Sequence, residues 1–258
     1  MLLAIDIDNN YTNCGIFNEN ELVDSFSLTT EKNKAKDEIK LLLKLILADK
    51  NIDINSIDDI IISSVIPELY PIYSKISHEI IGKNPIIISS GVKTGLNIRC
   101  ENPKDVGSDR IIRAVGGNYF YPGNVIIISA SPITTIDFIS EKKEFLGGLI
   151  LPGIDLLQNS LIRESAKIPD VQIEKAKKIL GNSTSKAVQN GIYFSYNYAI
   201  RGIIEDIFYE HKLKKENTKI LTTGPNAYLL DYKNYNLIDC QNLGLYGLSV
   251  IYKLNKNL

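Results

Sequence analysis

The first part of the chain consists of short apolar runs separated by turns rich in Asp and Asn. Leu2–Ile5, Asn13–Phe17 and Leu22–Leu28 each have the length and composition of a β-strand. From about Lys36 onward, apolar residues recur every three or four positions with lysines between them, which predicts an amphipathic helix. We therefore expect an antiparallel meander followed by a helix.

Strands and helices then alternate. The buried-type runs Ile60–Ser63 and Ile86–Ile88 bracket a helical stretch around Ile72–Ile81. An order of strand, helix and strand is typical of α/β proteins. The first half of the chain is therefore predicted to be an α/β unit with a mixed sheet.

The second half begins in the same way. Val125–Ser129 is an apolar strand ending in a turn of small residues and threonines, and Phe145–Leu151 continues the meander. Two long amphipathic stretches, Asp155–Ala166 and Ser183–His211, predict helices. This order repeats the strand-rich start and helical continuation of the first half.

The two halves also align directly. Leu3–Asp6 matches Ile126–Ser129 at an offset of 123 residues, which suggests two copies of one unit. We expect an N-terminal half of residues 1–120 and a C-terminal half of residues 121–258, each an α/β layer, facing each other across a cleft. Short apolar strands with polar turns are common, so this internal comparison alone leaves a chance resemblance open.

The amino-acid composition argues against several classes of function. The 258 residues carry 29 basic and 30 acidic side chains, and this balance lacks the positive excess of a nucleic-acid-binding protein. Three widely spaced cysteines and two histidines leave little material for a zinc site or a histidine-centred triad. No apolar run approaches the length of a membrane span, so we expect a cytoplasmic protein.

Two segments could carry chemistry. Asp6–Thr12 places carboxylates, amides and a hydroxyl in a turn, a set that suits Mg²⁺ and phosphate but is also typical of an ordinary hairpin. Gly107–Arg110 precedes an apolar helical run, with Ser108 as the expected N-cap. Asp109 in the first turn is favoured by the helix dipole, and a carboxylate there could also accept a proton from a substrate hydroxyl.

Five ordered segments together resemble the type III pantothenate kinases, a family of the acetate and sugar kinase/actin superfamily. They are Asp6–Thr12, Asn102-Pro103 with Gly107–Arg110, Gly147–Gly153, Gly181–Thr184 with Ala187 and Gly191, and Leu243, Leu245, Gly247 and Leu248. The resemblance runs nearly from end to end. It implies a duplicated ribonuclease-H-like (actin-like ATPase) fold and a homodimer with the pantothenate site near the subunit interface.

The resemblance also implies an activity, namely ATP-dependent phosphorylation of pantothenate to 4'-phosphopantothenate, the first step of coenzyme A biosynthesis, with Mg²⁺. Asp109 would be the catalytic base. Gly107, Ser108, Asp109, Arg110 and Thr184 would bind pantothenate, and Asp6, Asp8, Asn9, Asn10, Tyr11, Thr12, Asn13, Thr134 and Thr135 would bind ATP.

Several positions depart from the family pattern, mostly on the nucleotide side. Ser129 stands where the family has an aspartate associated with a monovalent cation, so binding of K⁺ or NH₄⁺ is not expected. Ser131 and Pro132 replace a glycine and a threonine, and Pro225 replaces a glycine. Cys100 takes the place of a common tyrosine.

Asp8 replaces a glycine in the first turn, where an unpaired carboxylate would repel a triphosphate. A pair of like charges about 4 Å apart costs on the order of 4 kcal/mol at an effective dielectric constant near 20. A Mg²⁺ ion bound by Asp8 would reverse this effect. The sequence therefore also allows a second interpretation, a non-catalytic paralogue that binds a ligand or acts as a regulatory protein. A sugar or acetate kinase ranks third, after the pantothenate kinase and this paralogue.

Overall fold

The computed structural model describes residues 1–165, 167–232 and 235–256. The chain forms two compact units: a first unit of Met1–Phe120 together with the chain from Asn242 onward, and a second unit of Tyr121–Gln241. Residues 121–258 were expected to form one half, but the C-terminal helix packs with the first unit. It does so because its apolar face lies against the helix that follows Gly107.

The first unit has a mixed sheet with the strand order β3-β2-β1-β4-β5. Strand β1 pairs antiparallel with β2 and parallel with β4. The strands are β1 (Leu2–Ile7), β2 (Tyr11–Asn18), β3 (Glu21–Thr29), β4 (Asp59–Ser64) and β5 (Ile86–Ile87), with the short strand β6 (Asn97–Ile98) later in the chain. The helices are α1 (Lys36–Asp49), α2 (Tyr70–Ile81), α3 (Ser108–Phe120) and α6 (Leu243–Asn255).

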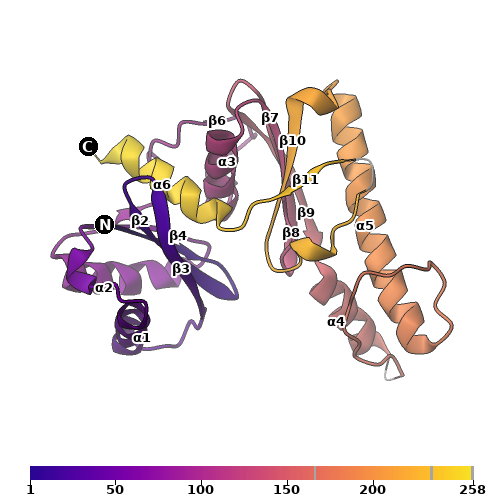
Figure 1. The fold of residues 1–258 in the computed structure, drawn as a ribbon, viewed down its shortest axis with the longest axis horizontal. Coiled ribbons are helices and arrows are strands. Elements are labelled where there is room, and N and C mark those ends of the chain that lie inside the picture. Colours follow the sequence, from indigo (N-terminus) through magenta and orange to yellow (C-terminus); the bar gives the residue numbers. More distant parts are fainter. Residues whose placement is uncertain (166, 233–234, 257–258) are drawn as a thin grey trace. The chain divides into compact units, whose positions relative to one another are not determined.

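The alternation of side chains along β1 determines which residues reach each face of this sheet. Helices α1 and α2 lie on one side of the sheet, and α3 and α6 lie on the other (Figure 1). Leu3, Ile5 and Ile7 belong to the buried cluster of α1 and α2, whereas Leu2 and Ala4 belong to that of α3 and α6. Successive side chains of a strand point to opposite faces, so the residue after Ile5 belongs to the row beneath α3. That residue is an aspartate, and its burial there is the first sign of a polar site.

Helices α3 and α6 cross at two glycines. A Cβ atom on Gly247 would lie 1.8 Å from the carbonyl oxygen of Ile112, and one on Gly116 would lie 2.3 Å from the carbonyl oxygen of Leu243. The backbones can approach this closely only because neither position carries a side chain. This crossing fixes α3, and therefore the residues at its N-terminus, over the sheet.

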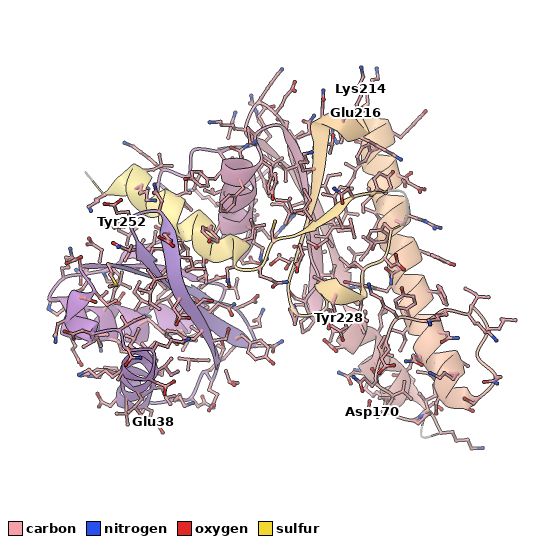
Figure 2. The ribbon with its side chains drawn as sticks, in the orientation of Figure 1. Glu38, Asp170, Lys214, Glu216, Tyr228 and Tyr252 are labelled. Atoms are coloured by element: carbon pink, nitrogen blue, oxygen red, sulfur yellow. The ribbon has the colours of Figure 1, made fainter. Side chains whose placement is uncertain are left out.

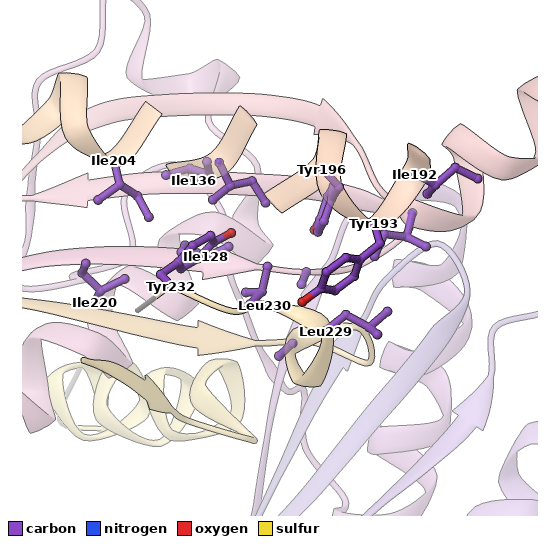
Figure 3. Packing of buried hydrophobic residues seen from close by; sticks show 14 of the residues in the cluster. Ile128, Ile136, Ile192, Tyr193, Tyr196, Ile204, Ile220, Leu229, Leu230 and Tyr232 are labelled. Atoms are coloured by element: carbon purple, nitrogen blue, oxygen red, sulfur yellow. The ribbon is translucent and has the colours of Figure 1, made fainter. Parts of the chain in front are cut away.

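The second unit repeats the topology of the first. Its strand order is β11-β10-β7-β8-β9, with β7 antiparallel to β8 and parallel to β10. The elements are β7 (Asn124–Ser129), β8 (Ile133–Ile139), β9 (Glu144–Pro152), α4 (Ile154–Glu164), α5 (Thr184–Glu210), β10 (Thr218–Thr223) and β11 (Leu237–Asp239). Figure 3 shows α5 packed on one face of this sheet, with Tyr196 and Ile204 against Ile128, Ile136 and Ile220.

The duplicated α/β fold expected from the sequence is confirmed, with one difference in the hairpin turns. Asp6 pairs with Asn13 across the first turn, whereas Ser129 pairs with Thr135 across the second. The second turn is therefore one residue shorter. The offset of 123 residues holds for the first strand of each unit and then changes, so Thr12 corresponds to Thr134.

The predicted helices agree with the structure to within a few residues. The segment expected over 155–166 is α4, which ends at Glu164, and Ala166 lies outside the described residues. Short 3-10 turns complete the chain: Ile54–Ser56, Pro67–Leu69, Pro103–Asp105, Lys215–Asn217 and Ala227–Leu229. In the part of the chain that the structure describes, none of the helices has the length and apolar character needed to span a bilayer.

Candidate active site

The turn between β1 and β2 presents two carboxylates in one row. The amide of Asp8 donates to the carbonyl of Tyr11 at 3.0 Å, and one carboxylate oxygen of Asp8 accepts from the amide of Asn9 at 2.7 Å. Asn9, Asn10 and Tyr11 are exposed at the tip. Because Asp6 and Asp8 are two residues apart at the end of a strand, both side chains reach the face covered by α3.

Asp6 is the most deeply buried carboxylate of the predicted site, with 5% of its surface exposed. Its Oδ1 atom has no hydrogen-bond partner among the described residues. Burial raises the pKa of Asp6 to about 7, although the nearby Arg113 guanidinium acts in the opposite direction. A buried carboxylate oxygen without a partner is a natural position for a ligand cation or its water.

The N-terminus of α3 is tied to the end of β4. The Ser108 hydroxyl donates to the Ser64 carbonyl at 3.0 Å and accepts from the Ser63 hydroxyl at 3.0 Å. The first carbonyl to accept helical bonds is that of Gly107, so Gly107 takes the N-cap position that the sequence assigned to Ser108. Ser108 is drawn into the sheet contact because β4 lies directly beside β1, with Ser63 opposite Asp6.

Arg113 joins the two acidic segments. Its Nη1 donates to Asp109 Oδ2 at 2.7 Å, and its Nη2 donates to Asp8 Oδ2 at 3.3 Å. Only 8% of Arg113 is exposed. Burial lowers the pKa of its guanidinium, but the three surrounding carboxylates raise it above its ordinary value, so the side chain stays charged.

Sequence reasoning missed Arg113, although a signal was present. An acid and an arginine four residues apart on a helix face the same side and pair readily. Asp109 and Arg113 have this spacing, and the pair becomes informative only once Asp8 is known to reach the same guanidinium.

Gly107 lies directly beneath the carboxylate of Asp109. A Cβ atom added to Gly107 would be 2.5 Å from Asp109 Oδ1. The conformation of Asp109 therefore depends on the absence of a side chain two residues earlier. Oδ2 is held by Arg113, and Oδ1 occupies the space over the glycine.

Two other predicted ATP-binding residues lie on different faces of β2. Thr12 is fully buried on the side of α1 and α2, and its hydroxyl is 2.9 Å from that of Thr30. The structure therefore gives the Thr12 side chain a packing partner away from Asp6. Asn13 lies opposite Asp6, and its side-chain oxygen accepts from the Ser27 hydroxyl at 2.7 Å.

The corresponding turn of the second unit has no acid at its first position. Ser129 and Ser131 hydroxyls are 3.3 Å apart, and Thr135 donates to Asp137 at 3.3 Å. Thr134 is buried against α5, where its hydroxyl is 2.8 Å from that of Tyr196. The Thr134 side chain therefore packs in the core, as Thr12 does in the first unit.

A loop after β10 closes this second turn. The Asn226 amide donates to the Ala130 carbonyl at 2.9 Å, and Gly224 has a φ of +93°. A Cβ atom at Gly224 would be 2.7 Å from the Ala130 oxygen, so glycine is needed there for both conformation and space. Pro225 follows in the loop without interrupting these bonds.

The second unit also contains a cleft of about 500 Å³ that the sequence did not reveal. Its walls are α4, the loop around Asp170 and the 3-10 turn Ala227–Leu229. Asn226 donates to Asp155 at 3.1 Å, and Gln158 donates to Asp170. Figure 2 shows Tyr228 on that turn, and 62% of Tyr228 is exposed. Thr184, predicted to bind pantothenate, is elsewhere in this unit, at the exposed start of α5.

The family model for type III pantothenate kinases matches residues 2–206. The chain belongs to the type III pantothenate kinase family. A type III pantothenate kinase of Finegoldia magna is 37% identical over 259 residues, which cover all of this chain and 98% of that protein. The resemblance drawn from the ordered motifs is therefore confirmed at the level of the family.

Solved structures share the fold at lower identity. A protein of Campylobacter jejuni described as a conserved Baf family transcriptional activator has a TM-score of 0.62 and 22% identity, with 99% of this chain and 100% of that chain covered. MreB 5 of Spiroplasma citri, bound to AMPPNP, has a TM-score of 0.54 and 11% identity, with 99% and 97% covered. Both show the actin-like architecture.

The structure brings together two of the family motifs of this chain: the first, Asp6–Thr12, and the second, which ends in Gly107–Arg110. Asp6 and Asp8 from the first motif and Asp109 from the second surround Arg113. Gly247 of the last motif supports the same helix by its close contact with Ile112. Three sequence segments that are far apart in the chain thus build one acidic site.

Proposed function

We propose that this chain phosphorylates pantothenate with ATP and Mg²⁺, as the first step of coenzyme A biosynthesis. Family membership supports this reaction, and the single structural observation that carries it is the Asp109 carboxylate held at the start of α3. A carboxylate in this position can accept the proton of a primary hydroxyl as that oxygen attacks a phosphoryl group.

Asp109 is the proposed catalytic base. Arg113 occupies Oδ2, which leaves Oδ1 over Gly107 as the oxygen for the substrate hydroxyl. The helix N-terminus adds backbone N–H groups and a positive potential at the same place. Gly107, Ser108 and Arg110 are proposed to bind the pantothenate, and Thr184 is a further proposed pantothenate-binding residue.

The first turn fits Mg²⁺ and a polyphosphate. Asp6 supplies a buried oxygen without a partner, which suits a metal ion or its water. When bound, Mg²⁺·ATP supplies the phosphoryl group and the positive charge that balances the acids. Exposed amides at Asn9 and Asn10 and the side chain of Asn13 could donate to phosphate oxygens. Ser129, being neutral, does not fit a monovalent cation, so the reaction should proceed without K⁺ or NH₄⁺.

The cleft of the second unit is a suitable place for the adenosine. It combines an exposed aromatic ring, Tyr228, with hydrogen-bonding side chains of Asn226 and Gln158. Thr134 and Thr135, the other proposed ATP-binding residues of this unit, lie at the start of β8, where the Thr134 hydroxyl pairs with Tyr196 and the Thr135 hydroxyl donates to Asp137. We further propose a homodimer, which light scattering after size-exclusion chromatography would test.

A coupled assay of ADP release tests the function. The purified protein should release ADP in a pantothenate-dependent manner with Mg²⁺, and Asp109→Asn should reduce kcat by about 10²–10⁴-fold, the usual contribution of a general base. Product should be identified as 4'-phosphopantothenate by mass spectrometry. Absence of pantothenate-dependent ADP release in the folded wild-type protein would reject this function, and equal activity of Asp109→Asn would reject Asp109 as the base.

A further inference from the structure

One buried guanidinium serves two acidic segments of the candidate active site. Arg113 bonds Asp109 at 2.7 Å and Asp8 at 3.3 Å, and it also counteracts the effect of burial on the carboxyl of Asp6. The proposed function uses Asp109 as base and Asp6 near the metal. It leaves Arg113 and its bond to Asp8 without a role.

We propose that Arg113 is a positioning residue that fixes the Asp109 carboxylate and uses Asp8 as its second anchor. This inference rests on the proposed function. The Nη1 bond restrains Asp109 Oδ2, so the orientation of Oδ1 follows from the position of the guanidinium. The guanidinium is itself restrained, because its other terminal nitrogen is bonded to a carboxylate in the turn after β1.

The planar shape of arginine is essential to this arrangement. Its two terminal nitrogens point in fixed directions, so one side chain can hold two carboxylates at once. Asp8 is restrained in turn, because its Oδ1 accepts from the amide of Asn9 at 2.7 Å. The chain of bonds therefore runs from the hairpin backbone through Asp8 and Arg113 to the base.

The same pair changes the electrostatics of the nucleotide side. Asp8 would repel a triphosphate if it were unpaired. Its carboxylate is instead paired with the permanently charged guanidinium of Arg113, a residue that is only 8% exposed. Loss of Arg113 would leave Asp8, Asp6 and Asp109 close together without this cation. Arg113 should therefore affect both the rate, through Asp109, and the binding of ATP, through Asp8.

These two effects can be separated by substitution. Arg113→Ala should lower kcat by about 30–100-fold, because a displacement of about 1 Å at a catalytic group can cost 10²-fold. It should also raise the KM for ATP about tenfold. Adding Asp8→Asn to Arg113→Ala should return the KM for ATP to within threefold of the wild type, because the negative charge of residue 8 is removed. The kcat should stay low, because Asp109 still lacks the hydrogen bond from Arg113.

Arg113→Lys gives a more conservative test, because it keeps the charge but cannot hold two carboxylates in fixed directions. It should lower kcat by at least tenfold with little change in the KM for ATP. Arg163→Ala removes an arginine whose side chain is 79% exposed on α4 and should leave both constants unchanged. Circular dichroism and thermal melts should establish that each variant is folded.

The outcomes distinguish this proposal from the function on which it rests. If Asp8→Asn fails to restore the KM for ATP, or if Arg113→Lys keeps the wild-type kcat, the positioning role is overturned. If the wild-type protein shows no pantothenate-dependent ADP release, the function is rejected. The dissociation constant of Mg²⁺·ATP, measured by calorimetry in the same variants, still reports whether Asp8 and Arg113 are coupled. If Arg113→Ala weakens the binding of Mg²⁺·ATP equally in the wild-type and the Asp8→Asn background, the proposed coupling is overturned.

Discussion

Replacement of Gly107 by alanine should uncouple catalysis from stability. The added Cβ would lie 2.5 Å from Asp109 Oδ1, about 0.9 Å short of ordinary van der Waals contact. The atom that it meets is the end of a side chain and not backbone, so the clash is relieved by rotation of the Asp109 carboxylate. Rotation about the side-chain torsions moves the proposed base away from its position beside Arg113.

The size of each effect follows from this geometry. Alanine in place of glycine at a helix N-cap costs about 1 kcal/mol, because glycine is nearly as good an N-cap as serine and alanine is a poor one. A displacement near 1 Å of a catalytic group can cost about 10²-fold in rate. We therefore expect Gly107→Ala to lower kcat by 10–100-fold while the midpoint of thermal unfolding falls by only a few degrees.

The coupled ADP assay, with pantothenate varied at saturating ATP, measures this effect. Gly202→Ala is the matched control, because a Cβ at that helical position meets no atom within 4 Å. The control should keep its activity and gain up to about 1 kcal/mol of stability from the higher helix propensity of alanine. A Gly107→Ala variant with wild-type kcat would show that the position of Asp109 Oδ1 does not limit the reaction.

Three further predictions concern stability. Gly247→Ala should destabilise the protein by about 3 kcal/mol in urea titration, because the new Cβ would lie 1.8 Å from the backbone oxygen of Ile112. In Mg²⁺-free buffer the Asp6 contribution to the free energy of unfolding, taken as the difference between wild type and Asp6→Asn, should be largest near pH 4 and fall by a few kcal/mol towards pH 8, because burial raises the pKa of Asp6 from 3.8 to about 7 and the folded state then holds the extra proton. A difference that does not change with pH would contradict the assignment. Tyr196→Phe should cost about 1 kcal/mol, since it removes the buried hydrogen bond to Thr134, and an unchanged melting curve would argue against that bond.

Local patterns were sufficient for most of the fold. The apolar run Leu2–Ile5 and the three- and four-residue spacing in α1 and α5 predicted elements that the structure confirms. The position of α6 was not predicted, because an apolar helix face is compatible with any apolar surface. Its partner was decided by Gly116 and Gly247, whose small size matters only once two helices are known to cross there.

The site was predictable in its parts but not in its connections. Asp6, Thr12 and Asp109 were all named from the family motifs, but the motifs did not show which side chains lie together. A strand sends neighbouring side chains to opposite faces, so Thr12 lies against Thr30 on the side of α1 and α2. The same reasoning places Asp6 and Asp8 together beneath α3, because the two are two positions apart at the end of the strand.

The meaning of Asp8 depends on a residue 105 positions away in the chain. Considered by itself, its carboxylate either repels a triphosphate or recruits a metal ion, and the local sequence contains nothing that decides the sign. The structure shows that the Asp8 carboxylate is paired, because Arg113 binds both Asp8 and Asp109. The charge that departs from the family pattern is therefore balanced by a cation on the helix of the proposed base. An acid in a phosphate-binding turn is consistent with kinase chemistry when such a cation is present, so substitutions at Asp8 should always be interpreted together with the state of Arg113.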